Sequence, residues 1–401
     1  MIRRQPIFWL SLAVVLSLGP ACRESKSVPE APAGDQSPAS AAEPAAGSEA
    51  KLTGVGDWPL FRGNALQDGI AKSPLPDRLQ VCWKFKTNEV IDATAAVADH
   101  TIYVGSLDEH LYALDLATGK EKWKTKLGGI KAPPSVHDGA VYVGSDDGIF
   151  HCVDAATGKE RWKYETSGEI MSGTNFAGQQ LLFGSYGDET LYCLSTAGKL
   201  LWQFKTQGPI NGSPAVVGER TFVAGCDGAL HVVDTTTGKE MSAIDLGGPA
   251  GATAAVNGDQ LYVGTISSNS VLGIDWKKGQ VVWTFESEKR QQPFYASAAV
   301  TETLVIAASR DKHVYGLDRK TGKEVWSFAT HGKVDSSPVV CGGRVYVGSM
   351  DGNLYVLDLD KGTEIQKVSL GRGITASPAV AEGCLVIGTQ EGMVFCLGTK
   401  K

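Results

Sequence analysis

Aspartate is the residue type that recurs most regularly among those that could do chemistry. Asp108, Asp147, Asp227, Asp311 and Asp351 stand in the same short turn of successive sequence repeats. Carboxylates in such a series could act as general bases or as ligands for a cation. Aspartate also closes turns through its own side chain, and the recurrence at one turn position favours that structural role.

Histidine and nucleophile motifs are missing from the chain. The seven histidines form no H-x-H or H-E-x-x-H motif, and the sequence holds no G-x-S-x-G, Walker-type or C-x-x-C-H motif. His151 and His231 occupy equivalent positions of two repeats, so we interpret them as blade-surface residues and not as a metal pair. The sequence therefore offers no catalytic, cofactor-binding or metal-binding residues.

A repeated phrase, ALDLATGKEKW at residues 113–123, indicates the elements that position these side chains. The glycine at Gly119 allows a tight turn between two short strands, and a large ring follows four residues later. Aligned on the turn glycine, that ring position carries Trp123, Trp162, Trp202, Ser242, Trp283, Trp326 and Gln366. The period of about 40 residues, with four short strands per unit, is typical of propeller blades. We expect each tryptophan to dock on a neighbouring backbone, and blades four and seven, which lack the ring, to be weaker.

The number of strands predicts how the ring closes. Eight hairpins of second and third strands can be counted, but the chain stops after the eighth, where an outer strand should follow. Residues about 79–87 have the character of an outer strand, and Trp83 lies 40 residues before Trp123, in phase with the repeats. An open ring would leave unpaired edges. We therefore predict an all-β fold: an eight-bladed β-propeller of four-stranded antiparallel blades, closed by the N-terminal strand, which completes the last blade.

Two cysteines fall on the strands that would close the ring. Cys396 occupies the small-residue position that Ala113 holds in the first repeat, which favours a buried small apolar side chain. By analogy with the hairpin around Gly119, Cys82 on the closing strand would be a near neighbour of Cys396, and a disulfide could form there. A register shift of one residue would instead place the two side chains on opposite faces.

The N-terminus has the composition of an exported protein. Arg3 and Arg4 precede an apolar run at residues 7–18, which is too short to span a membrane as a helix, and Ala21-Cys22 follows. We read residues 1–22 as a signal peptide whose Cys22 resembles a lipidation site, with secretion without lipidation as the alternative. Residues 23–56, rich in Ala, Pro, Ser and Glu, are expected to be a disordered tether to the propeller at residues 57–401.

The phrase A-x-D-x-x-T-G-K-E-x-W, together with the lead-in DWPLFRG at residues 57–63, closely resembles the pyrroloquinoline-quinone-like β-propeller repeat family. The resemblance covers about residues 57–401. Within the family, the chain is most similar in size and export signal to the lipoprotein of the outer-membrane β-barrel assembly machine. This resemblance implies a non-catalytic periplasmic scaffold, anchored to the outer membrane only by lipid, that binds envelope proteins and needs no cofactor.

The alternative that the same resemblance implies is a quinone-dependent oxidoreductase, or a sensor that binds such a quinone. Family members of that kind hold pyrroloquinoline quinone and calcium over the central funnel, with a catalytic aspartate and a disulfide between adjacent cysteines. This chain has no adjacent cysteine pair and no long insertions between repeats.

Loops of unusual length suggest where a protein partner binds. The loop at residues 266–270 is one residue longer than its counterparts, and residues 286–294 are about three longer. The second loop brings Lys289 and Arg290 close to Phe294 and Tyr295, a composition found at interface hot spots. Loops of both kinds should emerge on one face, so we predict a partner face there, with a tolerated insertion as the alternative. The net charge of -6 and the lack of a basic stripe argue against nucleic acid.

Overall fold

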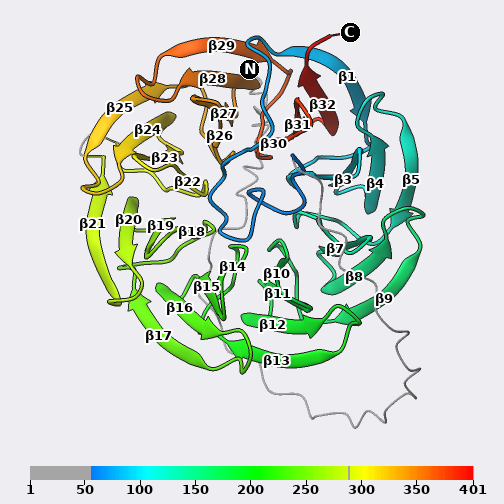
Figure 1. Ribbon diagram of the computed structural model, residues 1–401, viewed down its shortest axis with the longest axis horizontal. Coiled ribbons are helices and arrows are strands. Elements are labelled where there is room, and N and C mark those ends of the chain that lie inside the picture. Colours follow the sequence, from blue (N-terminus) through cyan, green and yellow to red (C-terminus); the bar gives the residue numbers. More distant parts are fainter. Residues whose placement is uncertain (1–55, 288–289, 401) are drawn as a thin grey trace, which may run out of the picture. The chain divides into compact units, whose positions relative to one another are not determined.

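The computed structural model describes residues 56–287 and 290–400, and these form eight four-stranded antiparallel sheets arranged in a ring (Figure 1). This confirms the predicted eight-bladed β-propeller. We number the blades in chain order, so that blade one holds β2–β5 and blade eight holds β30–β32 together with β1. No helix in the described ranges is long and apolar enough to cross a membrane.

The two inner strands of each blade are buried and made largely of small and β-branched residues, which suits the narrow centre of the ring. The innermost strands are Ala96–Ala98 (β2), Ser135–His137 (β6), Asn175–Ala177 (β10), Ala215–Val217 (β14), Ala255–Asn257 (β18), Ala299–Val300 (β22), Val339–Cys341 (β26) and Ala379–Ala381 (β30). The second strands are Thr101–Gly105 (β3), Ala140–Gly144 (β7), Gln180–Ser185 (β11), Arg220–Ala224 (β15), Gln260–Gly264 (β19), Leu304–Ser309 (β23), Arg344–Gly348 (β27) and Cys384–Gly388 (β31).

The two outer strands of each blade lie toward the circumference in Figure 1, and the outermost alternate exposed with half-buried or buried residues. The third strands are His110–Asp115 (β4), Ile149–Asp154 (β8), Thr190–Ser195 (β12), Ala229–Asp234 (β16), Ser270–Asp275 (β20), His313–Asp318 (β24), Asn353–Asp358 (β28) and Met393–Gly398 (β32). The outermost are Glu121–Lys126 (β5), Glu160–Glu165 (β9), Leu200–Lys205 (β13), Glu240–Asp245 (β17), Gln280–Glu286 (β21), Glu324–Ala329 (β25), Glu364–Ser369 (β29) and Gln80–Lys86 (β1).

The ring closes through the strand predicted to do so. β1 pairs antiparallel with β32, with Trp83 opposite Cys396 and Lys86 opposite Met393. The N-terminal strand is therefore the outer strand of blade eight, and neither end of the ring is left with an unpaired sheet edge.

The lead-in at residues 56–73, here called the strap, runs across the centre of the ring, where Figure 1 shows it in blue. Its carbonyl groups accept hydrogen bonds from innermost strands, as Trp58 and Val97 show by exchanging two bonds of 2.8 and 2.9 Å. The other strap bonds of this kind join Val136 to Pro59, Val216 to Ala65, Val256 to Leu66, Val300 to Asp68 and Val340 to Gly69. The strap thus satisfies backbone groups that the inner edges of the blades would otherwise leave unpaired.

Arg62 fixes the strap within the ring. Its side chain is almost fully buried, Nη2 donates to the Ala298 carbonyl at 2.9 Å, and burial lowers the pKa of Arg62 to about 9. Gly69, at φ +70°, makes room for the guanidinium, since a Cβ there would lie 1.9 Å from Nη2. The lead-in motif is therefore part of the core.

A chain of side-chain hydroxyl groups also links neighbouring blades around the channel. The backbone N–H of Ser297, for example, donates to Ser337 Oγ at 2.9 Å, and Ser377 N–H donates to Thr94 Oγ1 at 3.2 Å across the closure. Equivalent bonds join Gly173 to Ser213, Ser213 to Thr253, Thr253 to Ser297, and Ser337 to Ser377. Blade two has Pro133 at this position. Because proline carries neither a hydroxyl nor a backbone N–H group, the series of hydrogen bonds is interrupted there.

Candidate functional site

The recurring aspartates hold the blades together and are not arranged for catalysis. Asp351 accepts the backbone N–H of Asn353 within its own turn, the hydroxyl of Tyr355 at 2.7 Å, and the N–H of His331 from the preceding blade at 2.9 Å. Asp108, Asp188 and Asp311 bind tyrosines in the same way, and Asp227 binds His231. Burial and the bond to Asp311 raise the pKa of Tyr315 to about 12, which keeps its hydroxyl a donor. The turn-forming role is thus confirmed, and Asp108, Asp188 and Asp351 also link blades by accepting a backbone N–H from the preceding one.

Six junctions between blades are clasped by tryptophan. In the junction between blades one and two, Trp123 Nε1 donates to the Ala155 carbonyl at 3.0 Å, and the ring covers Gly158, where a Cβ would lie 2.6 Å from it. Trp83, Trp162, Trp202, Trp283 and Trp326 dock in the same way on the turn glycine of the following blade. This agrees with the expected docking on a neighbouring backbone.

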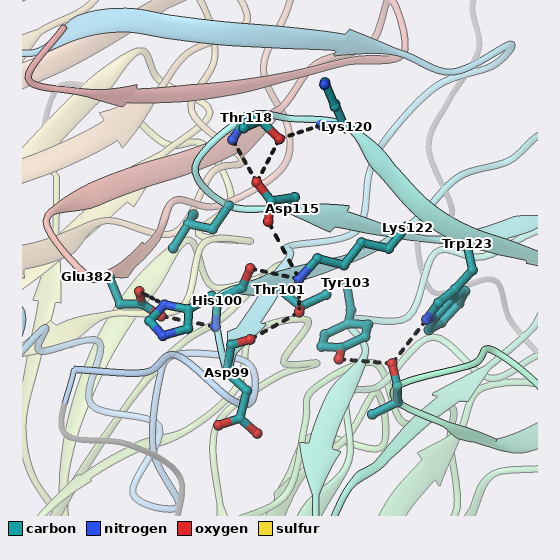
Figure 2. A network of polar contacts seen from close by, with 12 residues as sticks. Asp99, His100, Thr101, Tyr103, Asp115, Thr118, Lys120, Lys122, Trp123 and Glu382 are labelled. Carbon is teal, nitrogen blue, oxygen red and sulfur yellow. Dashed lines mark hydrogen bonds and ion pairs between the residues drawn. The ribbon is translucent and has the colours of Figure 1, made fainter. Parts of the chain in front are cut away.

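Figure 2 shows the surroundings of Trp123. Lys122, at the bulge before the tryptophan, donates to Thr101 Oγ1 at 2.7 Å and lies 3.7 Å from Asp115. Nearby, His100 of blade one pairs with Glu382 of blade eight. The surface of blade one beside Trp123 is thus charged, and the His100–Glu382 pair adds a polar contact to blade eight.

Across each blade, the residue that faces the docking position is small where that position holds tryptophan and larger where it does not. Trp123 faces Ala113, Trp162 faces Cys152, and Trp283 faces Gly273. Opposite Ser242 and Gln366, which lack the ring, the facing residues are Val232 and Val356. The larger valine occupies volume that the indole needs elsewhere, so that packing stays dense in both cases.

The junction between blades four and five is built in a different way. Ser242 does not reach the following turn, and Gly279 there is exposed, with no atom within 4 Å of the point where a Cβ would lie, whereas the glycines of the six clasped junctions are buried or half-buried. Trp276, on the blade-five turn, instead packs back onto Phe222 of blade four with ring centroids 5.1 Å apart. Its Nε1 donates to the Gly258 carbonyl at 3.1 Å, and its side chain is 7% exposed. Sequence reasoning missed Trp276. The one available signal was that this tryptophan does not stand at the aligned ring position.

Gln366 replaces the indole at the junction of blades seven and eight. Its side chain accepts from the Leu79 N–H at 2.9 Å and donates to the Leu79 carbonyl at 2.8 Å. An amide that makes both bonds to one residue suits this junction, because the closing strand arrives here without a preceding turn glycine. The structure therefore shows a substitute contact at each position that lacks tryptophan.

The proposed Cys82–Cys396 disulfide is wrong, because both residues are free cysteines in the structure. A bulge between Val81 and Trp83 places Trp83, and not Cys82, opposite Cys396. The Cys82 thiol instead lies 3.6 Å from the Thr399 carbonyl oxygen, and burial raises its pKa. The first hairpin has the same bulge at Lys122, so Cys82 does correspond to Lys122, but a bulge residue has no direct partner on the facing strand.

The two equivalent histidines are buried between strands and do not lie on an exposed blade surface. His151 Nδ1 lies 2.7 Å from Glu160 Oε1. His231 lies between two carboxylates, with Nε2 2.8 Å from Asp227 Oδ2 and Nδ1 2.7 Å from Glu240 Oε1. Burial lowers the pKa of His231, but the bonds to the two carboxylates outweigh it and the pKa is raised above its ordinary value. Both histidines are thus held by carboxylates of their own blades.

The residues of the predicted partner face differ in their exposure. Lys289 lies outside the described residues. Phe294 is 1% exposed and packs against Gly264, as Ile130 and Ile170 pack against their own glycines, so its assignment to a contact surface is wrong. Arg290 Nη1 lies 3.4 Å from the Tyr315 hydroxyl. The place of Phe294 in the core is therefore set by the repeat and does not depend on the length of the loop before it.

Tyr295, by contrast, is half-exposed. The guanidinium of Arg310 stacks on its ring at 3.9 Å and forms two hydrogen bonds with Asp335, at 2.7 and 3.0 Å. No feature of the sequence pattern singles out Arg310. Backbone bonds such as that from Arg310 to Pro293 confirm that the loops between strands two and three meet the loops between blades on one face.

Three carboxylates on the face that carries Tyr295 are engaged in structural contacts. Besides Asp335, Glu169 pairs with Lys131 at 2.6 Å, and Asp92 accepts the Thr375 hydroxyl at 2.6 Å. Nowhere in residues 56–287 and 290–400 do three or more His, Cys, Asp or Glu side chains form a group that could hold a metal ion. The donor set therefore does not fit a quinone–metal centre of the kind that the family resemblance raised as the alternative.

Comparisons with known proteins agree with the geometry. A family model described as outer membrane protein assembly factor BamB matches residues 77–186, 187–308 and 290–365. Among solved structures, BamB from Moraxella catarrhalis superposes with a TM-score of 0.68 at 20% identity, covering 80% of this chain and 98% of that one. A comparison with curated proteins finds no match.

Two dehydrogenases also share the fold. A europium-containing methanol dehydrogenase has a TM-score of 0.73 at 14% identity over 86% of this chain and 98% of that chain. Quinohemoprotein alcohol dehydrogenase from Comamonas testosteroni has a TM-score of 0.70 at 14% identity over 86% of this chain and 81% of its own. Likeness at such low identity establishes the propeller and leaves the activity open.

Proposed function

The chain belongs to the family described as outer membrane protein assembly factor BamB, and from that membership we propose that it is a non-catalytic scaffold that binds protein partners in the bacterial envelope. The family match over residues 77–365 is the observation that carries this proposal. The pairing of Asp335 and Glu169 with cations and of Asp92 with a hydroxyl supports it, because these three carboxylates are engaged in structural contacts.

The proposed location is the periplasmic side of the outer membrane. The basic and apolar start of the chain and Cys22 support export and attachment by lipid, with residues 23–56 as the tether. All of these residues up to 55 lie outside the described part of the structure. Replacing Cys22 with Ala should release the protein from sedimented membranes, and the mature N-terminus should carry a lipid mass only in the wild type.

Crosslinking in intact cells followed by affinity purification from membranes tests the scaffold function. We expect a reproducible envelope protein, with subunits of an outer-membrane assembly machine as the first candidates. The matched control is the same tagged protein purified without crosslinking. Recovery of no envelope protein above that control would contradict the proposal.

A quinone-dependent oxidoreductase is the second candidate, and it rests on the shared fold with the methanol and alcohol dehydrogenases. Purified protein supplied with pyrroloquinoline quinone and calcium would then gain the absorbance of the bound quinone and reduce a dye in the presence of an alcohol. For a scaffold, we expect neither signal.

A further inference from the structure

We propose that the junction between blades four and five is a docking slot for a tryptophan side chain presented by a protein partner. The slot consists of Ser242, Gly279 and the backbone of Trp276, and it is flanked by exposed apolar side chains. The identity of the occupant as part of a protein rests on the proposed scaffold function. The chemistry of the slot itself rests only on the geometry below.

The molecule contains six examples of the proposed contact. In each, an indole lies on the turn glycine of the next blade and donates Nε1–H to the carbonyl of the residue after the preceding strand, as Trp162 does to Thr196 at 3.0 Å. In blade five the corresponding groups are Gly279 and the Trp276 carbonyl. Both groups of the acceptor surface are thus present, and only the ring from the preceding blade is replaced, by Ser242.

Exposure distinguishes this glycine from the other six. Gly279 is exposed, and a Cβ built on it would meet nothing within 4 Å, whereas at Gly158 and Gly322 it would collide with an indole. Trp276 does not cover it, because that ring turns inward to Phe222. Val232, which faces Ser242, is buried and fills only the interior of the junction. An incoming ring would therefore lie at the surface, on the glycine.

The rim of the slot carries apolar side chains, whereas blades one and two carry charged side chains at the corresponding bulge. Met241, Val281 and Val282 are 50%, 37% and 41% exposed, whereas Lys122 and Arg161 occupy the bulge in the first two blades. These apolar side chains belong to the two outermost strands that flank the slot, and exposed apolar side chains of this size are available for protein contacts. Apolar walls around a glycine floor and a carbonyl acceptor match an aromatic ring that carries an N–H donor. Among side chains, tryptophan alone combines these two properties in one large ring.

Binding of N-acetyl-L-tryptophanamide to the purified propeller tests the slot directly. Saturation-transfer NMR should show weak, saturable binding of this probe, and none of N-acetyl-L-leucinamide. Gly279→Asn should weaken probe binding at least about tenfold, since asparagine tolerates a left-handed backbone and adds a side chain over the floor. Gly178→Asn is the matched control, because Gly178 has a similar φ of +62° and equally open surroundings in blade three. Equal binding to the wild type and to Gly279→Asn would overturn the proposal.

A ring supplied by the chain itself should also occupy the slot. Ser242→Trp combined with Val232→Ala recreates the pair that Trp123 forms with Ala113, and it should abolish probe binding while raising the melting temperature. Unchanged probe binding in this folded variant would contradict the proposal. If the variant does not fold, the Gly279→Asn measurement decides alone.

Site-specific crosslinking in cells tests the occupant. A photo-crosslinking residue at the exposed position Gln280 should capture a partner segment within reach of a tryptophan, identified by mass spectrometry. The same residue at Lys323, beside a glycine that Trp283 already covers, should not capture that segment. Capture without a nearby aromatic residue would overturn the proposed occupant. A partner recovered by purification but indifferent to Gly279→Asn would leave the scaffold function standing and refute the slot.

Discussion

The junctions at Trp162 and at Ser242 solve the same packing problem in two ways. At the first, one indole bridges two blades and is anchored by a hydrogen bond to Thr196. At the second, blade five sends Trp276 back onto Phe222, and the turn glycine that would have received a ring stays exposed. The inside of a junction must be filled from one blade or the other, because voids in a core are costly. The outside need not be filled, and this is where two junctions with filled interiors can differ in function.

The largest expected effect is the difference in stability between substitutions at Trp162 and at Ser242, two equivalent positions of the docking series. Trp162→Ala should lower the free energy of unfolding by about 3–5 kcal/mol, as other large core truncations do. Ser242→Ala should change it by less than about 0.5 kcal/mol, because no interblade contact depends on that side chain. Urea denaturation followed by circular dichroism measures both. Equal losses would mean that the indole does not clasp the blades.

Trp276→Ala tests whether the reversed indole takes over the structural role. We expect a loss of about 2–4 kcal/mol, since a buried ring and its bond to the Gly258 carbonyl disappear. The loss should be somewhat smaller than at Trp162, because Arg220 and Lys277, which lie over the ring, can move into part of the space. The same denaturation experiment applies. A loss below about 1 kcal/mol would show that blades four and five are held by other contacts.

The smallest expected effect concerns His231, which in blade four stands where blades one, three, six and seven have tyrosine. Its pKa is raised in the folded state, so its stabilising contribution is fully present below its unfolded pKa of about 6.5 and is lost as pH rises through the higher folded pKa. The pKa of Asp227 is lowered, so its contribution is present above about pH 3.9 and is lost as pH falls through the lower folded value. The two groups therefore act in separate pH windows.

His231→Tyr should remove the part of the stability that the wild type loses as pH rises above about 6.5. The difference in melting temperature between wild type and variant should shrink as pH rises above about 6.5, because the protonated His231 is then lost from the folded wild type. A tyrosine hydroxyl can still bind Asp227, as Tyr355 binds Asp351, so the fold should be kept. His110→Tyr, at a partly exposed position of blade one, is the control. A pH-independent difference would show that His231 does not gain a proton preferentially in the folded protein.

Much of the fold followed from the repeat. A glycine turn and a ring four residues later define a hairpin locally, and Trp83 could be placed in blade eight because its spacing to Trp123 continued the period. Single-residue details did not follow. The bulge at Cys82 shifted the register by one residue and separated it from Cys396, and the repeat placed Phe294 in the core although its loop looked like an insertion.

The candidate site was the part least accessible to sequence reasoning. Ser242 was recognised as a position without a ring, and from that a weak blade was expected. Trp276 lies 34 residues further along the chain, and nothing in the local pattern indicates that its ring turns back to Phe222. Whether a missing side chain leaves a void, a substitute contact or an exposed surface depends on neighbours that only the folded ring brings together.

The sequence by itself determined the blades, their number and the strand that closes the ring, because turns and strand alternation are set by residues close together in the chain. The tertiary structure alone decided how each blade meets the next and how the strap at residues 56–73 seals the inner edges. Those contacts join residues tens to hundreds of positions apart, as Arg62 and Ala298 do. Their geometry is fixed by closure of the ring, which no single repeat contains.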